Sequence, residues 1–283
     1  MKENQKVIVV VGPTASGKSD FAVDLAFKNN GEIISADSRQ IYKGLDLGTG
    51  KVTEKEMSGI KHYLLDVADP KEVFSVTDYV KLAENAITEI LNRGKTPIIV
   101  GGTGFYIQAL VDGLIIPEVP PNILLRKKLE KQSIAKILSI LKKLDPKRYE
   151  TIDKNNPRRI IRAIEIATAL GKVPMLKAVS KYNPELIGIT LPKEVLKERI
   201  HKRLLSRIKA GMIDEVKKLH ANGLSWKRME ELGLEYRFIA RFLQNKITKE
   251  EMVEQLETAI NQYAKRQMTW FKRDKRVRWI STI

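Results

Sequence analysis

Cysteine is missing from this chain of 283 residues, so disulfides, thiolate metal sites and cysteine nucleophiles are excluded. Histidine is scarce, and the three that occur, His62, His201 and His220, lack the spacing of a metal site. No apolar run approaches the roughly 18 residues that a membrane-spanning helix needs. The segment Met1–Lys6 lacks the long apolar stretch of a signal peptide. We therefore expect a cytoplasmic protein without a membrane partner, and the 43% of hydrophobic residues predict a globular core.

A balance of acidic and basic residues is lacking only in the second part of the chain, where Lys and Arg outnumber Asp and Glu. Residues 1–110 hold 13 Lys and Arg against 14 Asp and Glu, whereas residues 111–283 hold 38 against 20, a net charge of +18. A lysine-rich, solvated surface would account for this excess, and so would a polyanionic partner. Clustered Lys and Arg release counterions from a phosphate backbone, which makes nucleic-acid binding strong and sensitive to salt. Composition alone does not choose among RNA, DNA, acidic lipid and a merely solvated surface.

Short β-branched runs alternate with amphipathic segments in the first part of the chain. Helical spacing of apolar residues predicts helices at Gly17–Lys28 and Val76–Leu91. The runs predict buried strands at Lys6–Val11, Glu32–Ser35, Lys61–Asp66, Thr96–Val100 and Glu185–Thr190. Such alternation indicates a parallel sheet covered by helices on both faces, with ligands bound at the carboxyl ends of its strands.

The pattern changes after Gly113, where Pro117, Pro120 and Pro121 interrupt it. Residues 122–170 are basic and helical in pattern, and residues 193–272 are helical with breaks near positions 211, 223 and 233. We therefore expect an α/β core from residues 1–114 and 185–283, which includes a basic helical C-terminal part. Residues 115–184 would form an all-helical insertion.

The strongest local motif lies between the first predicted strand and the first predicted helix. Glycines let backbone N–H groups curl around phosphate oxygens, and a helix N-terminus adds about half a unit of positive charge. Lys18 supplies a mobile cation, and the Ser19 hydroxyl can ligate Mg²⁺. The motif predicts a phosphate or diphosphate site without identifying ATP; its residues are Gly12, Pro13, Thr14, Ala15, Ser16, Gly17, Lys18 and Ser19.

Two further segments follow strands at the same edge of the predicted sheet. Asp37 could act as a metal ligand, a general base or a helix N-cap, and Gln40 could read the edge of a base. Thr103, in a Gly-Gly-Thr-Gly turn, places a hydroxyl after the strand Thr96–Val100, although an ordinary tight turn would explain it equally well.

Arginine is arranged in helical stripes in the basic part. Arg158 and Arg162 share one helix face, and a second face carries Arg199, Arg203 and Arg207. The segment Lys265–Arg273 interleaves cations with Trp270 and Phe271, as nucleic-acid surfaces often do. Solvated helix faces would explain each stripe singly, whereas their occurrence together favours a nucleic-acid partner.

These motifs, in this order, resemble those of the tRNA dimethylallyltransferase family. The resemblance covers residues 6–280, practically the whole chain, and implies a P-loop NTPase-like core of three layers. Besides the phosphate loop, it is carried by Ser35–Lys51 (S-A-D-S-R-Q-I-Y-K-G-L-D-L-G-T-G-K), Val100–Tyr106 (V-G-G-T-G-F-Y), Asn156–Glu165 and Tyr263–Phe271.

The resemblance implies transfer of a dimethylallyl group from dimethylallyl diphosphate to N6 of the adenosine immediately 3′ of the tRNA anticodon. Asp37 matches the family's proposed general base, and Thr103 matches a threonine at the reacting centre. Lys18, Arg203 and a Mg²⁺ on Ser19 would stabilise the departing diphosphate. A monomer that binds the anticodon stem-loop is expected by the same analogy.

The resemblance also implies tRNA-contacting positions, in addition to Asp37 and Thr103. Two departures bear on them: Glu235 replaces the glycine of the family's Gly-Tyr-Arg, and the helical insertion is short, which suggests a smaller tRNA clamp. The remaining positions are Ser38, Arg39, Gln40, Arg126, Arg158, Arg159, Ile160, Ile161, Arg162, Leu232, Gly233, Leu234, Glu235, Tyr236 and Arg237.

Other functions remain compatible with the phosphate loop alone. A P-loop kinase, or an isopentenyltransferase acting on a free adenine nucleotide, would have no need of the basic second part. An RNA-binding ATPase or chaperone would hydrolyse nucleotide without prenylating adenosine. Salt dependence separates the first group from a tRNA enzyme, because only the latter should lose activity steeply between low and moderate salt.

Overall fold

The computed structural model describes residues 5–281. It divides the chain into two compact units, one built from the residues up to Gly113 and from Ser180 onward, the other from Leu114–Val179. Residues 180–184, expected in the insertion, belong to the first unit, because the fifth strand begins at Tyr182. Each unit has its own buried core and is described separately.

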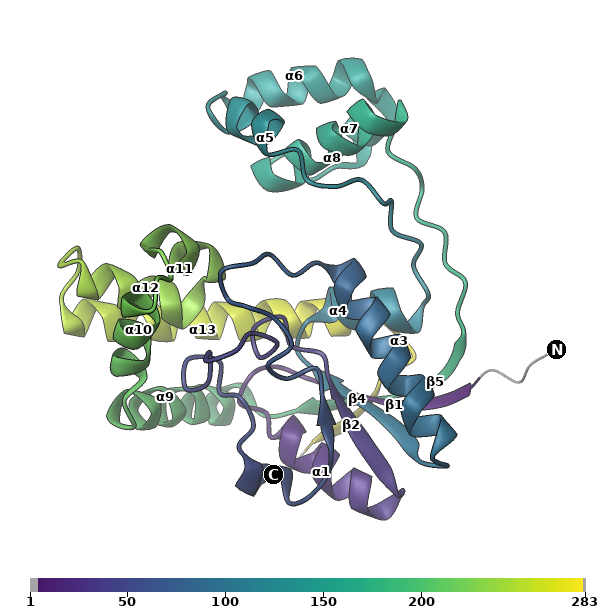
Figure 1. Ribbon diagram of the computed structural model, residues 1–283, viewed down its shortest axis with the longest axis vertical. Coiled ribbons are helices and arrows are strands. Elements are labelled where there is room, and N and C mark those ends of the chain that lie inside the picture. The colour runs from purple at the N-terminus through teal and green to yellow at the C-terminus, as the bar shows by residue number, and fades with distance from the viewer. Residues whose placement is uncertain (1–4, 282–283) are drawn as a thin grey trace. The chain divides into compact units, whose positions relative to one another are not determined.

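A parallel sheet forms the centre of the first unit, as the strand and helix alternation predicts (Figure 1). Its order is β3-β2-β4-β1-β5-β6 among the described residues, and every neighbouring pair runs parallel. β1 lies near the middle and is flanked by β4 and β5, so its carboxyl end opens at the centre of the sheet edge. The strands are β1 Gln5–Val11, β2 Gly31–Ser35, β3 His62–Tyr63, β4 Thr96–Gly101, β5 Tyr182–Thr190 and β6 Arg278–Ser281.

Helices cover both faces of this sheet. Ile8 and Val10 of β1 point to the face covered by α1, Lys18–Lys28, where they pack with Ala22. The alternate residues of β1 point to the other face and pack with α3, Val76–Asn92, and α4, Gly104–Val111. Alternate side chains of one strand thus enter two cores, which gives the three layers of the expected fold.

The C-terminal helices form a third core beside the loop that follows β2. Ile41, Tyr42 and Leu45 of this loop pack against the helices. Figure 1 shows α13 running from this helical group towards α4. Within the described chain, none of the helices combines the length and apolar character that a membrane crossing requires. The helices are α9 Lys193–Lys209, α10 Met212–Ala221, α11 Trp226–Leu232, α12 Leu234–Leu243 and α13 Lys249–Phe271.

The second unit consists of four helices within residues 114–179. Leu129, Ile137, Leu141 and Ile160 are among its buried residues. Asn and Ser side chains cap three of the helices by accepting a hydrogen bond from the third helical N–H, and the Asp145 side chain caps α7 in the same way. The helices are α5 Ile123–Glu130, α6 Ile134–Leu144, α7 Pro146–Thr151 and α8 Pro157–Leu170.

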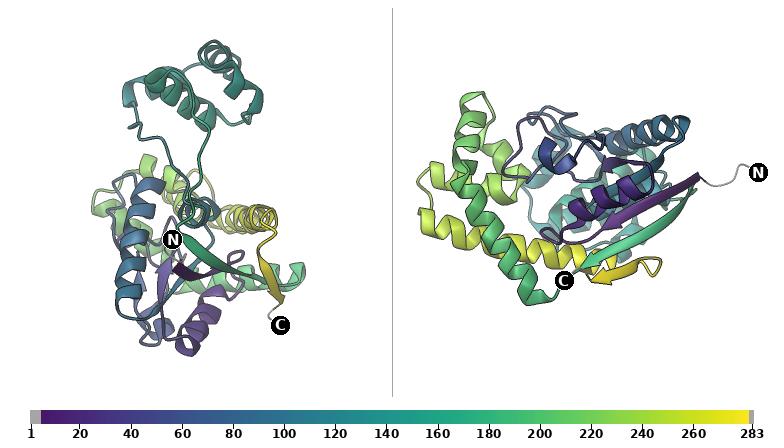
Figure 2. Two further views of the ribbon diagram at one scale, coloured as in Figure 1. Left: turned by 90° about the vertical axis from the view of Figure 1, so that its right-hand side faces the viewer. Right: turned by 90° about the horizontal axis from the view of Figure 1, so that it is seen from below.

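Some sequence predictions of elements were wrong in extent or incomplete. The strand predicted at Lys61–Asp66 is only two residues long, because Leu64 and Asp66 adopt φ of 63° and 55°, which ends extended pairing. The sequence also missed the short helix α2, Glu54–Met57, and the edge strand β6, which pairs with β5 (Figure 2). The separation of α12 from α13 was not predicted either, since residues 244–248 carry no glycine or proline signal.

Candidate active site

The phosphate loop joins the end of β1 to the start of α1. Ala15 and Gly17 adopt φ of 63° and 84°, so the chain turns twice through the left-handed region. Gly17 is the N-cap of α1 and has no side chain to occupy the helix N-terminus. The hydroxyl of Ser16 is buried and has no hydrogen-bond partner within residues 5–281. A concave loop with open helical N–H groups and an unpaired hydroxyl suits an anion.

The arginine stripe of α9 faces this loop. The Arg203 guanidinium donates a hydrogen bond to the Thr14 hydroxyl. One turn away, Nη1 of Arg199 lies 3.6 Å from where a Cβ of Gly17 would be. In the opposite direction, Arg207 packs so closely on Gly50 that any side chain there would overlap it. The spacing of four that the sequence shows therefore places one face of α9 along the phosphate loop.

Several positively charged side chains lie close together at this site, partly shielded from water. Burial and, to a smaller extent, the Arg203 charge lower the pKa of the Lys18 ammonium to about 8, and the Asp37 charge opposes this shift. Burial also lowers the pKa of Arg203 to about 10, with Arg207 adding to the effect. The three cations Lys18, Arg203 and Arg207 are partly buried and repel one another, and a bound anion would offset this repulsion. The cluster therefore calls for a polyanion such as a diphosphate.

Asp37 lies at the edge of the cation cluster and is held by its own backbone. Its Oδ1 accepts hydrogen bonds from the N–H groups of Arg39 at 2.8 Å and Gln40 at 3.4 Å. The helix N-cap interpretation of this residue is wrong, because the chain forms a turn and not a helix after Asp37; Oδ1 closes this turn, and Oδ2 is left available for other chemistry. Thr103 fixes the same segment, because its Oγ1 accepts the N–H of Ser38 at 3.0 Å and its own N–H donates to Ala36 at 3.1 Å.

Sequence reasoning missed Gln267 as a member of the site. Its side-chain oxygen accepts the N–H of Thr14 at 2.8 Å, and its nitrogen donates to the Gly102 carbonyl at 3.0 Å. It therefore ties the phosphate loop to the turn that carries Thr103. A detectable signal existed: Gln267 is the polar member of the buried stripe of α13, between Ala264 and Phe271.

A second loop is held in place by a carboxylate from α10. Glu215 accepts the backbone N–H groups of Asp46, Leu47 and Gly48 at 3.1, 2.6 and 3.0 Å. The Tyr236 hydroxyl donates to the same carboxylate at 2.8 Å. The loop continues to Gly50, whose carbonyl accepts the Gln40 side-chain amide at 3.1 Å and whose Cα side faces Arg207.

In the segment Leu232–Arg237, singled out for tRNA contact, two residues are buried and the other four are half-buried. Leu232 and Tyr236 are 3% and 1% exposed, so their side chains belong to the core of the helical group. The Leu232 carbonyl accepts the Arg39 Nε at 2.7 Å, which connects this segment to the Asp37 loop. Arg237 bonds to the Glu230 carbonyl at 3.0 Å. Gly233 and Leu234 form the turn into α12, with φ of 78° and 39°.

The candidate RNA contacts in the second unit divide into exposed and internal residues. Glu165 is buried and accepts Arg126 Nε and Nη2, each at 2.7 Å, and Arg162 Nη1 at 3.2 Å. These arginines hold the start of α5 against α8, and each keeps about a third of its side chain exposed. Ile160 and Ile161 are buried in this unit's core. The exposed cations of the motif are Arg158 and Arg159.

The basic and aromatic segment at the end of α13 also divides between surface and core. Lys265, Arg266 and Arg273 are exposed, but Phe271 is buried and Trp270 packs against the same core. The aromatic rings therefore support the sheet instead of forming a stacking surface for bases.

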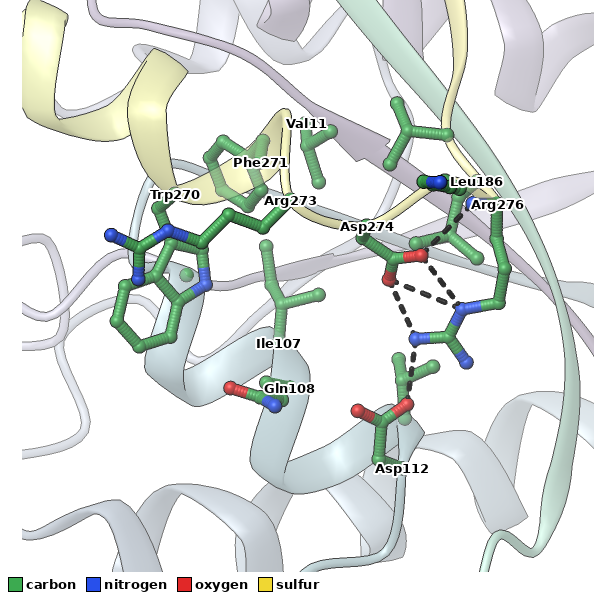
Figure 3. A pocket seen from close by; sticks show the side chains of 14 residues that line it. Val11, Ile107, Gln108, Asp112, Leu186, Trp270, Phe271, Arg273, Asp274 and Arg276 are labelled. Carbon is green, nitrogen blue, oxygen red and sulfur yellow. Dashed lines mark hydrogen bonds and ion pairs between the residues drawn. The ribbon is translucent and has the colours of Figure 1, made fainter. Parts of the chain in front are cut away.

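A separate cavity of about 380 Å³ lies between α4 and the connection from α13 to β6 (Figure 3). Arg276 crosses its rim and donates to Asp112 at 2.8 Å and to Asp274 at 2.6 Å, and this pairing lowers the pKa of Asp274. Ile107 and Leu186 contribute apolar lining. Trp270, Phe271 and Arg273 of the basic and aromatic segment line this cavity, whereas the phosphate-loop residues, Asp37 and Thr103 do not.

The residues around Ser19 fit a magnesium ion bound jointly with a phosphate group. Ser19, Ser35 and Gln40 line a small cavity of about 20 Å³, enough for a water-sized occupant. Within the described chain there is no cluster of three acidic or histidine side chains that would hold a metal alone. Mg²⁺ commonly uses one or two protein oxygens together with substrate phosphates and water, and this donor set has that character.

Comparisons with known proteins agree on one family. The family model described as IPP transferase matches residues 40–274. A tRNA dimethylallyltransferase of Anoxybacillus flavithermus is 43% identical over 281 residues, which cover 97% of this chain and 90% of the relative. That of Acetivibrio thermocellus is 44% identical over 285 residues, covering 97% and 91%.

Solved structures give the same result. A tRNA isopentenylpyrophosphate transferase from Bacillus halodurans superposes with a TM-score of 0.75 at 38% identity, covering 99% of this chain and 90% of that one. A eukaryotic dimethylallyltransferase acting on tRNA superposes with a TM-score of 0.84 at 29% identity, covering 98% and 74%.

Proposed function

The chain belongs to the IPP transferase family, and from that premise we propose that it transfers a dimethylallyl group from dimethylallyl diphosphate to N6 of an adenosine in tRNA. The target is the adenosine immediately 3′ of the anticodon. The observation that carries the proposal is the meeting of Asp37 with the partly buried cations Lys18 and Arg203 at one sheet edge. A base and a diphosphate site side by side are what such a transfer requires.

The reaction forms a C–N bond and breaks a C–O bond. The N6 lone pair attacks C1 of the donor, and the diphosphate leaves with the electron pair of the C1–O bond. Asp37 accepts the N6 proton as the new bond forms, because the exocyclic amine of adenine is a weak nucleophile on its own. General-base catalysis of this kind contributes roughly 10²- to 10⁴-fold. The bonds from Arg39 and Gln40 to Oδ1 hold the carboxylate in a fixed orientation.

The cation cluster stabilises the leaving group. Negative charge grows on the diphosphate as it departs, and Lys18, Arg203 and the phosphate-loop N–H groups are already in position to receive it. Ser19 would hold a Mg²⁺ ion shared with the diphosphate. When bound, this ion supplies Lewis-acid stabilisation of the phosphate oxygens. The phosphate loop thus retains a diphosphate and transfers no phosphoryl group.

The target adenosine must leave its stack to reach Asp37. Base extrusion costs a few kcal/mol, which contacts to the RNA backbone must offset. The exposed Arg158 and Arg159 on α8 are candidates for those contacts, and the excess of 18 positive charges after residue 110 favours an RNA partner. We expect the chain to act as a monomer, which light scattering of the free protein and of its tRNA complex would test.

Mass spectrometry of tRNA nucleosides provides the direct test. The protein is incubated with unmodified tRNA, dimethylallyl diphosphate and Mg²⁺, and the digest is searched for N6-dimethylallyladenosine. Matched reactions replace tRNA with a free adenine nucleotide, or replace the donor with ATP. Prenylated nucleotide without prenylated tRNA would favour a free-nucleotide enzyme, and phosphorylated product from ATP would favour a kinase.

A further inference from the structure

The diphosphate site holds an additional carboxylate that the mechanism above does not use. Glu235 lies in the first turn of α12, and its Oε1 is 3.9 Å from Nη1 of Arg207. Both side chains are shielded from water, with 12% and 15% of their areas exposed. The group at the phosphate loop therefore contains the cations Lys18, Arg203 and Arg207, with Arg199 beside Gly17, and the carboxylates Asp37 and Glu235.

The backbone next to Glu235 adopts a strained conformation. Leu234, immediately before it, has φ of 39°, a conformation that a leucine rarely adopts. The Arg207 guanidinium also packs closely on Gly50, which limits its movement. The ion pair between Glu235 and Arg207 is therefore set by the backbone and by packing, unlike a surface ion pair between two mobile side chains.

The charges in this group influence one another. Burial raises the pKa of Glu235, while the Arg207 and Arg203 charges lower it. Conversely, burial lowers the pKa of Arg203 and of Arg207, and Glu235 opposes the shift in both. Each partner thus favours the charged form of the other, and the carboxylate reduces the positive potential that a diphosphate would meet.

We propose that Glu235 sets the charge of the diphosphate site and thereby promotes release of the product diphosphate. This inference rests on the proposed function. Removing the charge of an ionised Glu235 would make the site more positive by one unit. Inorganic diphosphate has one more ionisable oxygen than the prenyl ester, so it responds more strongly to the potential. Glu235 therefore weakens the hold on the product more than the hold on the donor.

The test is binding of inorganic diphosphate with Mg²⁺, measured by calorimetry on the full chain without tRNA. Glu235→Gln keeps the shape and removes the charge, and we expect it to bind diphosphate on the order of tenfold more tightly. Its KM for the donor should fall less than this, and its kcat should fall because release slows. Glu84→Gln on α3, which removes a carboxylate paired with Lys181 at 2.6 Å, is the matched control and should leave diphosphate affinity unchanged.

A conservative variant separates charge from shape. Glu235→Asp keeps the charge and should bind diphosphate within about threefold of the wild type. Unchanged affinity in Glu235→Gln would overturn the inference, because the carboxyl would then be neutral in the free protein. Weaker binding of diphosphate by Glu235→Gln, or failure of this variant to fold, would also overturn the inference. Either result would mean that Glu235 serves to hold Arg207 in place. Because diphosphate binding is measured without turnover, failure of this inference can be distinguished from failure of the proposed function, which the prenylation assay tests.

Discussion

The side chain of Gln267 accepts a hydrogen bond from the backbone N–H of Thr14 at 2.8 Å, joining the last helix to the phosphate loop across 253 positions of sequence. The same amide donates to Gly102, so one side chain spans two strand ends. The donor site and the turn that carries Thr103 are therefore held at a fixed separation. Proximity and orientation of this kind can decide the rate of a bimolecular transfer.

Replacing Gln267 by Leu should lower kcat/KM for the donor by at least tenfold. The variant leaves the Thr14 N–H and the Gly102 carbonyl without partners in a buried place, which costs about 1–3 kcal/mol of stability. Steady-state kinetics and thermal unfolding measure the two effects. Gln108→Leu, at an exposed position of α4, is the control and should change neither. Wild-type kinetics in the Gln267 variant would show that the clamp is dispensable.

Removing the carboxylate of Asp37 should abolish turnover while sparing tRNA binding. Asp37→Asn keeps an oxygen to accept the Arg39 N–H but cannot accept the proton from N6, so we expect a loss of roughly 10²- to 10⁴-fold in kcat. The tRNA affinity should stay within several-fold. Asp69→Asn is a matched control, because Asp69 likewise accepts the N–H two residues further on at 2.8 Å. Near-normal turnover in Asp37→Asn would exclude a general-base role.

Use of the donor should decline in mildly alkaline solution. The pKa of Lys18 is lowered to about 8 by burial and by Arg203, so the ammonium predominates below pH 8 and the neutral amine above it. Only the ammonium attracts a diphosphate. The value of kcat/KM for the donor should therefore be level below pH 8 and fall as pH rises beyond it. The arginine of Lys18→Arg does not titrate in this pH range, so the pH profile of this variant should lack the decline even if its rate is low. If the decline persists in the variant, a group other than Lys18 causes it.

Adding a single methyl group at Gly50 should weaken diphosphate binding. Gly50 has φ of 59° and faces Arg207, so Gly50→Ala strains the backbone and displaces the guanidinium. We expect at least a tenfold loss of diphosphate affinity by calorimetry. Gly59→Ala carries similar strain, at φ of 79°, with no atom within 4 Å of the new methyl group. Equal losses in the two variants would mean that backbone strain, and not Arg207, is responsible.

Neutralising the exposed arginines of α8 should weaken tRNA binding for every tRNA alike. Arg158→Ala combined with Arg159→Ala should reduce the affinity for tRNA and make it less dependent on salt. The slope of log affinity against log salt should become shallower by about 0.7–0.9 for each RNA phosphate that the protein no longer neutralises. Filter binding between low and moderate salt measures this. Lys28→Ala with Lys81→Ala, two exposed cations of the neutral part, is the control pair. An unchanged slope in the arginine variant would place the RNA-binding surface elsewhere.

Local chemistry explains what could be predicted of this molecule. Strand β1, the phosphate loop and α1 follow from a β-branched run, glycines and an amphipathic helix within 24 residues, Gln5–Lys28. The spacing of Arg199, Arg203 and Arg207 was visible as a helical stripe, but the sequence could not say what the stripe faces. Ile160, Ile161, Leu232 and Tyr236, proposed for RNA contact, instead have their side chains in the cores.

The amino-acid sequence by itself determined the parallel α/β core, the phosphate loop and the family, because these depend on turn chemistry and periodicity over short stretches. Only the tertiary structure decided that Gln267 clamps the loop, that Arg207 meets Gly50, and that the partly buried Glu235 lies beside Arg207. Those contacts join segments separated by up to 253 positions, and the balance of their charges depends on burial that forms only when the helices pack.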